Sequence, residues 1–186
     1  MTAPVFPVST SGCQLIKMIS RMKKTLWFPV VSMALCALVL WTVQGLALTL
    51  VQVRGPSMIP SYADGQVLFV NRLAYGLQGP IIGEYLWIWK APNLGDAVVV
   101  KSPESGPLVV KRVAGLPGMS LNLRNHSLMV GNRTVALSPS QEYWLSACPR
   151  VPEGFLFLLG DNLDRSMDSR DWGFVPFHDV LGRSFF

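Results

Sequence analysis

Cysteine and histidine are scarce in this 186-residue sequence, which holds three cysteines and two histidines. Cys13, Cys36 and Cys148 lie far apart, and neither His126 nor His178 stands at metal-ligand spacing from any of them. We therefore expect no bound metal and no other cofactor. Cys148 is the only cysteine beyond residue 47, so no internal disulfide is expected in that part of the chain.

Charge is missing from a long stretch, because residues 25–53 contain no Asp, Glu, Lys or Arg. About 20 apolar residues span the hydrocarbon core of a bilayer, so the sequence predicts a transmembrane helix from residue 26 to about residue 46. Trp27 and Trp41 lie near its ends, where aromatic side chains favour the membrane interface.

Acidic residues are absent from the first 24 positions, which carry four basic side chains: Lys17, Arg21, Lys23 and Lys24. These account for most of the net charge of +5. A nucleic-acid-binding domain would need basic residues clustered on its folded part, so no nucleic-acid partner is expected. Basic residues ahead of an apolar stretch predict instead that the N-terminus stays in the cytoplasm.

The chain is therefore expected to have three parts: a cytoplasmic basic tail (1–24), a transmembrane anchor (25–47) and an extracytoplasmic domain (48–186). The alternative is a cleaved signal peptide, with Gly45-Leu46-Ala47 as its small-x-small site. The apolar stretch is longer than that of a typical signal peptide, which favours an uncleaved anchor.

Short apolar segments separated by turn residues follow the anchor and indicate β-strands. They cover residues 48–53, 66–71, 97–101, 108–113, 121–123, 127–130, 134–137 and 155–160. No long helical period occurs among them, so we predict a mainly β fold with a barrel-like sheet. Residues 80–94 are rich in Trp, Ile and Leu, and fit either a core strand or short helix, or a surface that enters the bilayer.

Ser57 lies in the stretch Arg54-Gly55-Pro56-Ser57-Met58-Ile59-Pro60. The two prolines restrict φ, and Gly55 lets another backbone come close, so the turn can hold a hydroxyl group in one place. A nucleophile needs that rigidity, but an ordinary loop can have it too. The function of Ser57 therefore depends on whether the chain supplies a base.

Lys111 is a candidate base, because burial lowers the pKa of a lysine and makes it neutral near physiological pH. It lies in the apolar segment 108–113, where strand alternation directs Lys111 and Arg112 to opposite faces. The segment alone does not decide which of the two is buried. A Ser-His-Asp triad is the alternative, but neither His126 nor His178 has a convincing setting.

Residues 160–176 are dense in acids, arginines and serines directly after an apolar strand. Such a segment is either a solvated surface loop or a loop that holds charges in fixed pairs and offers a serine hydroxyl to a nearby lysine.

Taken together, these segments resemble bacterial type I signal peptidases (leader peptidases), the Ser-Lys family that removes signal peptides. Five motifs carry the resemblance, and they occur in the family's order. They are residues 55–60 (GPSMIP), 64–71 (DGQVLFVN), 95–100 (GDAVVV), 110–118 (VKRVAGLPG) and 160–176, which includes Gly-Asp-Asn and Asp-Ser-Arg. The match covers most of residues 48–182.

The resemblance implies a domain of coiled antiparallel β-sheets and a serine endopeptidase at the outer face of the cytoplasmic membrane. It implies that Ser57 is the nucleophile, that Lys111 is the general base, and that Ser166 hydrogen-bonds Lys111 and orients it. It also implies an ion pair between Asp161 and Arg112, with Asp168 and Arg170 nearby as architectural charges.

The sequence departs from some members of the family at Gly55, where they carry a serine whose hydroxyl helps to form the oxyanion hole. The backbone N–H of Ser57 must then do more, together with a second backbone donor. Residues 118–155 leave room for only a small hairpin. The resemblance also implies shallow apolar pockets for small residues, typically alanine, and we expect Met58, Leu68 and Val70 to form their walls.

The expected partners are the signal peptides of exported pre-proteins and the lipid bilayer, with the enzyme acting as a monomer. Two alternatives stay open. One is a dedicated processing peptidase, such as one for conjugative pilins. The other is a membrane-tethered domain that binds exported peptides without cutting them.

Overall fold

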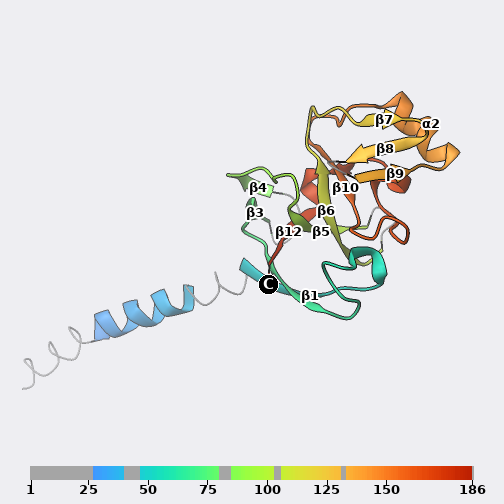
Figure 1. Cartoon of the computed structure of the whole chain (residues 1–186). Helices are drawn as coiled ribbons and strands as arrows, with labels where there is room; N and C mark the ends of the chain where they lie inside the picture. Colours follow the sequence, from blue (N-terminus) through green and yellow to red (C-terminus); the bar gives the residue numbers. More distant parts are fainter. Residues whose placement is uncertain (1–26, 40–46, 80–84, 103–105, 131–132, 186) are drawn as a thin grey trace, which may run out of the picture. The chain divides into compact units, whose positions relative to one another are not determined.

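The computed structural model describes residues 27–39, 47–79, 85–102, 106–130 and 133–185 (Figure 1). The chain divides into two compact units, Met1–Gly45 and Leu46–Phe186. In the first unit, residues 27–39 are helical. Across the described ranges, no helix is both long and apolar enough to cross a membrane. Residues 25–26 and 40–46 of the predicted anchor lie outside those ranges.

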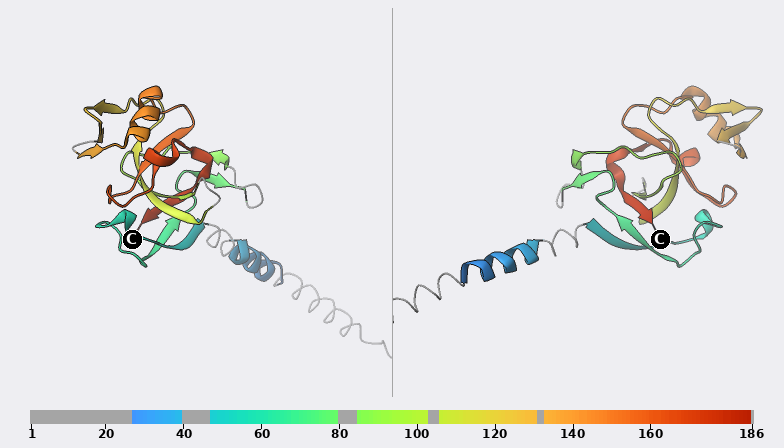
Figure 2. Two further views of the ribbon diagram at one scale, coloured as in Figure 1. Left: turned by 90° about the vertical axis from the view of Figure 1, so that its right-hand side faces the viewer. Right: turned by 60° about the vertical axis from the view of Figure 1, so that its left-hand side comes forward.

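The second unit is built on a seven-stranded antiparallel sheet in the order β1-β2-β12-β5-β6-β10-β11. Its strands are β1 (Leu48–Gln52), β2 (Val67–Asn71), β5 (Ala97–Lys101), β6 (Leu108–Gly115), β10 (Phe155–Leu159), β11 (Val175–Pro176) and β12 (Val180–Phe185). Register shifts interrupt the β5–β12 and β6–β10 pairs, and the sheet coils rather than lying flat (Figure 2). The mainly β antiparallel prediction is confirmed.

Two smaller sheets flank the large one. The first pairs β3 (Gly76–Gln78) with β4 (Tyr85–Ile88), and the second contains β7 (Asn122–Arg124), β8 (Ser127–Val130) and β9 (Arg133–Ala136). A helix, α2 (Pro139–Ala147), follows β9. The three short strands predicted between residues 118 and 155 are confirmed, whereas helix α2 was not predicted, so the segment holds more than a small hairpin.

Both faces of the central strand β5 are buried, and this burial explains why a polar side chain on the neighbouring strand is enclosed. Ala97 and Val99 pack into one hydrophobic cluster, whereas Val98 and Val100 pack into another on the opposite face. Alternate residues of a strand point to opposite faces, so a polar residue on a strand beside β5 is buried if it faces either cluster. The adjacent strand β6 carries such a residue, Lys111, opposite Val98.

The aromatic stretch 80–94 is not a core strand. Residues 80–84 lie outside the described ranges, and β4 exposes its apolar side chains on both faces. Leu86, Trp87, Ile88 and the following Trp89 are 52–70% exposed. Tyr85 holds the hairpin in place, because its hydroxyl donates a 2.9 Å hydrogen bond to the carbonyl oxygen of Val180.

Candidate active site

Ser57 is the middle residue of a short 3₁₀ turn, η1 (Pro56–Met58). Gly55 precedes the turn with φ of +83°, a conformation that glycine adopts without strain. The N–H of Gly55 donates a 2.7 Å hydrogen bond to Asp64 Oδ1, and the Met58 side chain is fully buried beneath the turn. These contacts hold the backbone of Ser57 in a single arrangement.

Asn162 joins this turn to the loop that follows β10. Its backbone N–H donates to the carbonyl oxygen of Ser57 at 2.9 Å, and its Nδ2 donates to the carbonyl oxygen of Pro56 at 3.1 Å. Two segments more than a hundred residues apart in sequence are therefore tied together at Ser57. Sequence reasoning did not assign a role to Asn162, although it follows Asp161 in the Gly-Asp-Asn motif.

Lys111 is the buried member of the Lys111–Arg112 pair, with only 3% of its surface exposed. Its Nζ donates a 2.9 Å hydrogen bond to Ser166 Oγ and lies 5.5 Å from the centre of the Trp172 ring. Burial lowers the pKa of Lys111 below its ordinary value. Asp168 partly offsets that shift by raising the pKa, whereas Arg170 lowers the pKa further.

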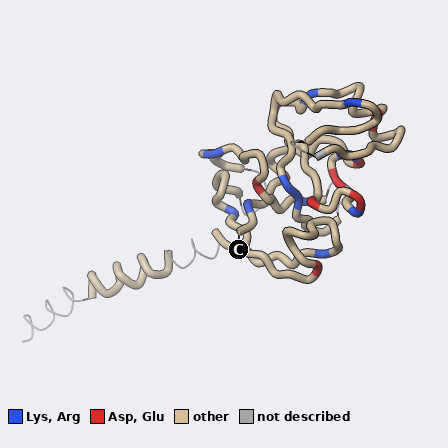
Figure 3. The backbone as a smooth tube through the Cα atoms, viewed as in Figure 1, with Lys and Arg blue, Asp and Glu red and all other residues tan. Residues whose placement is uncertain are grey.

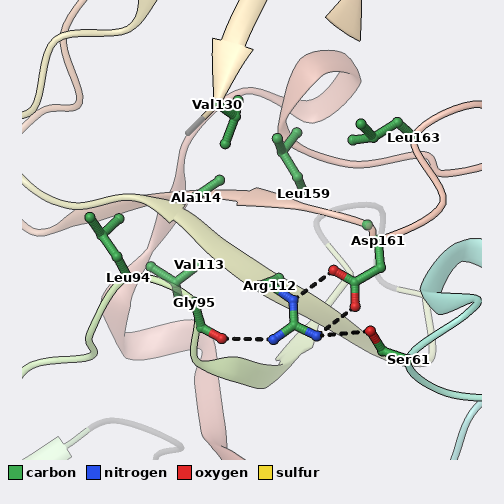
Figure 4. A pocket seen from close by; sticks show the side chains of 11 residues that line it. Ser61, Leu94, Gly95, Arg112, Val113, Ala114, Val130, Leu159, Asp161 and Leu163 are labelled. Atoms are coloured by element: carbon green, nitrogen blue, oxygen red, sulfur yellow. Dashed lines mark hydrogen bonds and ion pairs between the residues drawn. The ribbon is translucent and has the colours of Figure 1, made fainter. Parts of the chain in front are cut away.

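Arg112 points to the other face of β6 and forms a fork-like ion pair with Asp161. Its Nε and Nη2 donate to the two carboxylate oxygens of Asp161, each at 2.6 Å, and its Nη1 donates to the carbonyl oxygen of Gly95 at 2.8 Å (Figure 4). This pair lines a cavity of about 620 Å³ that is otherwise mostly apolar. Arg112 thus fixes the position of Asp161, one residue before Asn162.

Asp168 and Arg170 form a second, deeper ion pair, with Arg170 Nε 2.9 Å from Asp168 Oδ1 and both side chains buried. Asp168 also accepts from the N–H of Gly160 at 3.1 Å and caps α3 (Ser169–Trp172). Arg170 Nη2 donates to the carbonyl oxygen of Ser166 at 3.2 Å. The pair therefore fixes the backbone that presents Ser166 to Lys111.

Gly160 lies where the backbone carbonyl of Ser57 comes close to the side chain of Ser166, and its role was not predicted from the sequence. A Cβ atom placed on Gly160 would lie 2.6 Å from the carbonyl oxygen of Ser57 and closer still to Ser166 Oγ. Real Cβ atoms essentially never come within 3.0 Å of such neighbours. Gly160 therefore lets the Ser57 turn and Ser166 come together beside the Lys111 amine.

The expected pocket residues Met58, Leu68 and Val70 lie in the core. They pack in one cluster with Val99 and Val110 and are at most 1% exposed. In this structure they support the Ser57 turn from below.

The backbone N–H groups of the turn differ in their partners. The N–H of Gly55 donates to Asp64, whereas the N–H of Ser57, early in the turn, has no partner within the turn.

The two histidines are paired elsewhere. His126 Nδ1 lies 2.6 Å from Glu142 Oε2, and His178 lies 3.6 Å from Asp179. Among the residues that the structure describes, neither histidine hydrogen-bonds Ser57 or Lys111, and no group of three or more metal-ligating side chains occurs. Lys and Arg of the second unit are interspersed with Asp and Glu along the chain (Figure 3).

Comparisons with known proteins bear on the family of this chain. The model of the family "Signal peptidase, peptidase S26" matches residues 25–186. A probable signal peptidase I-1 of Synechocystis is 32% identical over 134 residues, which cover 70% of this chain and 65% of that protein. A signal peptidase I of Bacillus caldolyticus is 33% identical over 147 residues, which cover 70% of this chain and 74% of that protein.

A crystal structure of a signal peptidase I from Enterococcus faecalis is 31% identical in sequence, with a TM-score of 0.38, and covers 50% of this chain and 97% of that one. The family match extends over most of the sequence and includes every residue of the Ser57, Lys111 and Ser166 constellation. The chain therefore belongs to the signal peptidase family, peptidase S26.

Proposed function

We propose that this protein is a serine endopeptidase that removes N-terminal signal peptides from exported pre-proteins, with Ser57 as nucleophile and Lys111 as general base. The observation that carries the proposal is the buried Lys111 amine, 2.9 Å from Ser166 Oγ, where Gly160 lets Ser166 and the Ser57 turn meet. Relatives named signal peptidase I support the choice of substrate.

In the proposed reaction, neutral Lys111 takes the proton of Ser57 Oγ while that oxygen attacks the scissile carbonyl carbon. The protonated Lys111 then gives the proton to the leaving amine, and the carbon–nitrogen bond breaks to leave an acyl-enzyme. A water molecule, deprotonated by the same lysine, hydrolyses the ester and restores Ser57. Ser166 accepts a hydrogen bond from Nζ and so aims the amine.

Transition-state charge would gather on the substrate's carbonyl oxygen. The backbone N–H of Ser57 is the proposed donor to that oxygen, with a second backbone donor beside it. Gly55 contributes through its conformation, since its own N–H is bonded to Asp64. The substrate would bind extended along a strand edge.

The direct test is incubation of the full-length chain in detergent with a pre-protein that carries an Ala-x-Ala site. We expect cleavage after the second alanine, identified by N-terminal sequencing of the product, and no cleavage by Ser57→Ala. Binding of the pre-protein without cleavage would favour the non-catalytic alternative. Cleavage of one pilin-like substrate alone would favour the dedicated processing peptidase.

The pH dependence of the reaction should report Lys111. A free lysine has a pKa of about 10.4, and burial lowers that of Lys111. Because the base must be neutral in the free enzyme, kcat/KM should fall as pH drops below the lowered pKa. We therefore expect the acid limb well below pH 10.4, measured with a fluorogenic Ala-x-Ala peptide. An acid limb at the value of a free lysine would contradict this role.

We also propose that the chain is held at the cytoplasmic membrane by a single anchor, residues 25–47, with the tail 1–24 in the cytoplasm and residues 48–186 outside, as a monomer. The basic tail and uncharged apolar stretch support this topology. The exposed apolar residues Leu86 to Trp89, followed by Lys90, support contact of the domain with the bilayer interface.

Brominated lipids, which quench nearby tryptophans, test this contact. In vesicles of such lipids, the double variant Trp87→Phe, Trp89→Phe should lose a clear part of the quenchable tryptophan fluorescence of the reconstituted full chain. Trp144→Phe is the control, because Trp144 is half-buried and donates to the carbonyl oxygen of Arg170. Equal loss in the two variants would rule out a special membrane contact of the β3–β4 hairpin.

A further inference from the structure

Trp172 lies against the proposed base without being part of the proposed proton transfer. It is the last residue of α3, and its ring centre is 5.5 Å from Lys111 Nζ. A cation within about 6 Å of an indole centroid is attracted to the negative face of the ring, and the attraction grows when the cation is desolvated. Lys111 is almost fully buried, so its protonated form would be attracted to the ring more strongly than an exposed lysine would be.

The indole N–H of Trp172 does not explain why a tryptophan stands at this position. Within the described residues, its Nε1 is buried and has no hydrogen-bond partner. Trp144 shows the usual arrangement, because its Nε1 donates to the carbonyl oxygen of Arg170 at 2.8 Å. An unpartnered indole N–H costs free energy that a phenylalanine at the same place would avoid. The contribution of Trp172 must therefore come from its ring.

The charged groups that face Lys111 already have partners. Asp168 is bound to Arg170 and to the N–H of Gly160, and Asp171 accepts from Gln141 Nε2 at 2.7 Å. Among the described residues, Lys111 forms no ion pair within 4.0 Å, and its one hydrogen bond goes to the neutral hydroxyl of Ser166. A positive charge formed on Nζ during acylation would therefore lie beside the Trp172 ring with no carboxylate of its own.

We propose that Trp172 is a positioning residue that stabilises the protonated form of Lys111 through the face of its indole ring. The inference rests on the proposed function of Lys111 as the base. Burial favours the neutral form of Lys111, and the ring offsets part of the cost when Lys111 takes the proton of Ser57. Trp172 thus acts on the reaction only through Lys111.

The direction in which the pKa of Lys111 moves when the ring is changed distinguishes this role from simple packing. Weakening the ring's attraction disfavours protonated Lys111, so the pKa of Lys111 and the acid limb of kcat/KM both move to lower pH. If Trp172 only excluded water, opening its place to solvent would favour the protonated form and move both to higher pH. The two explanations therefore predict opposite shifts.

Fluorinated tryptophans weaken the ring's negative face while keeping its shape. We would place tryptophan with no, one, two or three ring fluorines at position 172 of the full chain in detergent micelles. The pKa of Lys111 would be followed by NMR of ¹³Cε-labelled lysine, with the Lys111 signal identified by its loss in Lys111→Met. We expect the pKa to fall stepwise, by about 0.5–1.5 pH units in total.

The rate gives a second readout. On the pH plateau above the acid limb, where Lys111 is fully neutral, kcat/KM for an Ala-x-Ala peptide should fall about 3–10-fold across the series as the base weakens. The same fluorinated residues at the exposed Trp87 are the control and should change neither quantity. A Lys111 pKa that stays constant or rises across the series would overturn the inference. The NMR titration decides this even if the enzyme cleaves no Ala-x-Ala peptide, an outcome that would count against the proposed function alone.

Discussion

Lys111→Met is expected to lower kcat/KM for a pre-protein by about 10³-fold or more, because it removes the proposed base of Ser57. Methionine keeps a flexible side chain of similar length in the same apolar surroundings. It also removes an amine whose burial is unfavourable when charged. The free energy of unfolding should therefore stay within about 1 kcal/mol of the wild-type value, or rise.

Lys101→Met provides the matched control. Lys101 lies on the adjacent strand β5 and is exposed, so its replacement should leave kcat/KM within about twofold. Cleavage rates would be measured with the same pre-protein, and stability by urea denaturation. A Lys111→Met protein that retains a tenth or more of wild-type activity would contradict the assignment of Lys111 as the base.

Gly160→Ala is expected to have the second largest effect, with a loss of about 10²-fold in kcat/KM, since small displacements of catalytic groups are costly. The added methyl group would lie 2.6 Å from the carbonyl oxygen of Ser57 and overlap Ser166 Oγ. It would also lie 2.5 Å from Ser166 Cβ, which cannot turn away as a hydroxyl group can, so the Ser57 turn and Ser166 must move apart. We expect a loss of about 1–3 kcal/mol in stability as well.

Gly106→Ala tests whether any added methyl group would do the same. Among the described residues, a Cβ on Gly106 would meet only the Ser102 side chain, at 3.2 Å, and Gly106 has no positive φ. This variant should keep its activity and stability. Unchanged activity in Gly160→Ala would show that Ser57 and Ser166 need not approach each other at Gly160, and would weaken the proposed site.

The orientation of Lys111 shows how far the sequence could lead. Alternation along residues 108–113 predicted that Lys111 and Arg112 face opposite sides, and the burial of Lys111 agrees with it. Which of the two is buried depends on the strands packed around β6. Lys111 lies opposite Val98, on the face that carries the cluster of Val98, Val113 and Leu158, and this placement follows from pairing between distant segments.

Other features were missed for different reasons. Strand β12 lies in the middle of the large sheet, but Gly182, Arg183 and Ser184 hide its apolar pattern. Helix α2 buries only Leu145 and so shows little periodicity, although Ser138 and Gln141 form a capping box that marks its start. The contacts of Gly160 and Trp172 join segments that only the fold brings together.

The pairing of Arg112 with Asp161 is found in the structure, and so is the proximity of Asp168 and Arg170 to Ser166. The resemblance implied these contacts, whereas the charges alone did not, because a loop dense in acids and arginines allows many pairings. The assignment of Ser57 and Lys111 to catalysis remains a proposal that the geometry supports.

Covalent labelling of Ser57 is the most direct test of the central claim. A peptidyl phosphonate that ends in Ala-x-Ala reacts at phosphorus with an activated serine, expels its phenol group and leaves a stable ester that mass spectrometry can locate. We expect one adduct, on Ser57, formed about 10²-fold or more slowly by Lys111→Met. An adduct on another residue, or labelling of Ser57 at the same rate in both proteins, would contradict the Ser57–Lys111 mechanism.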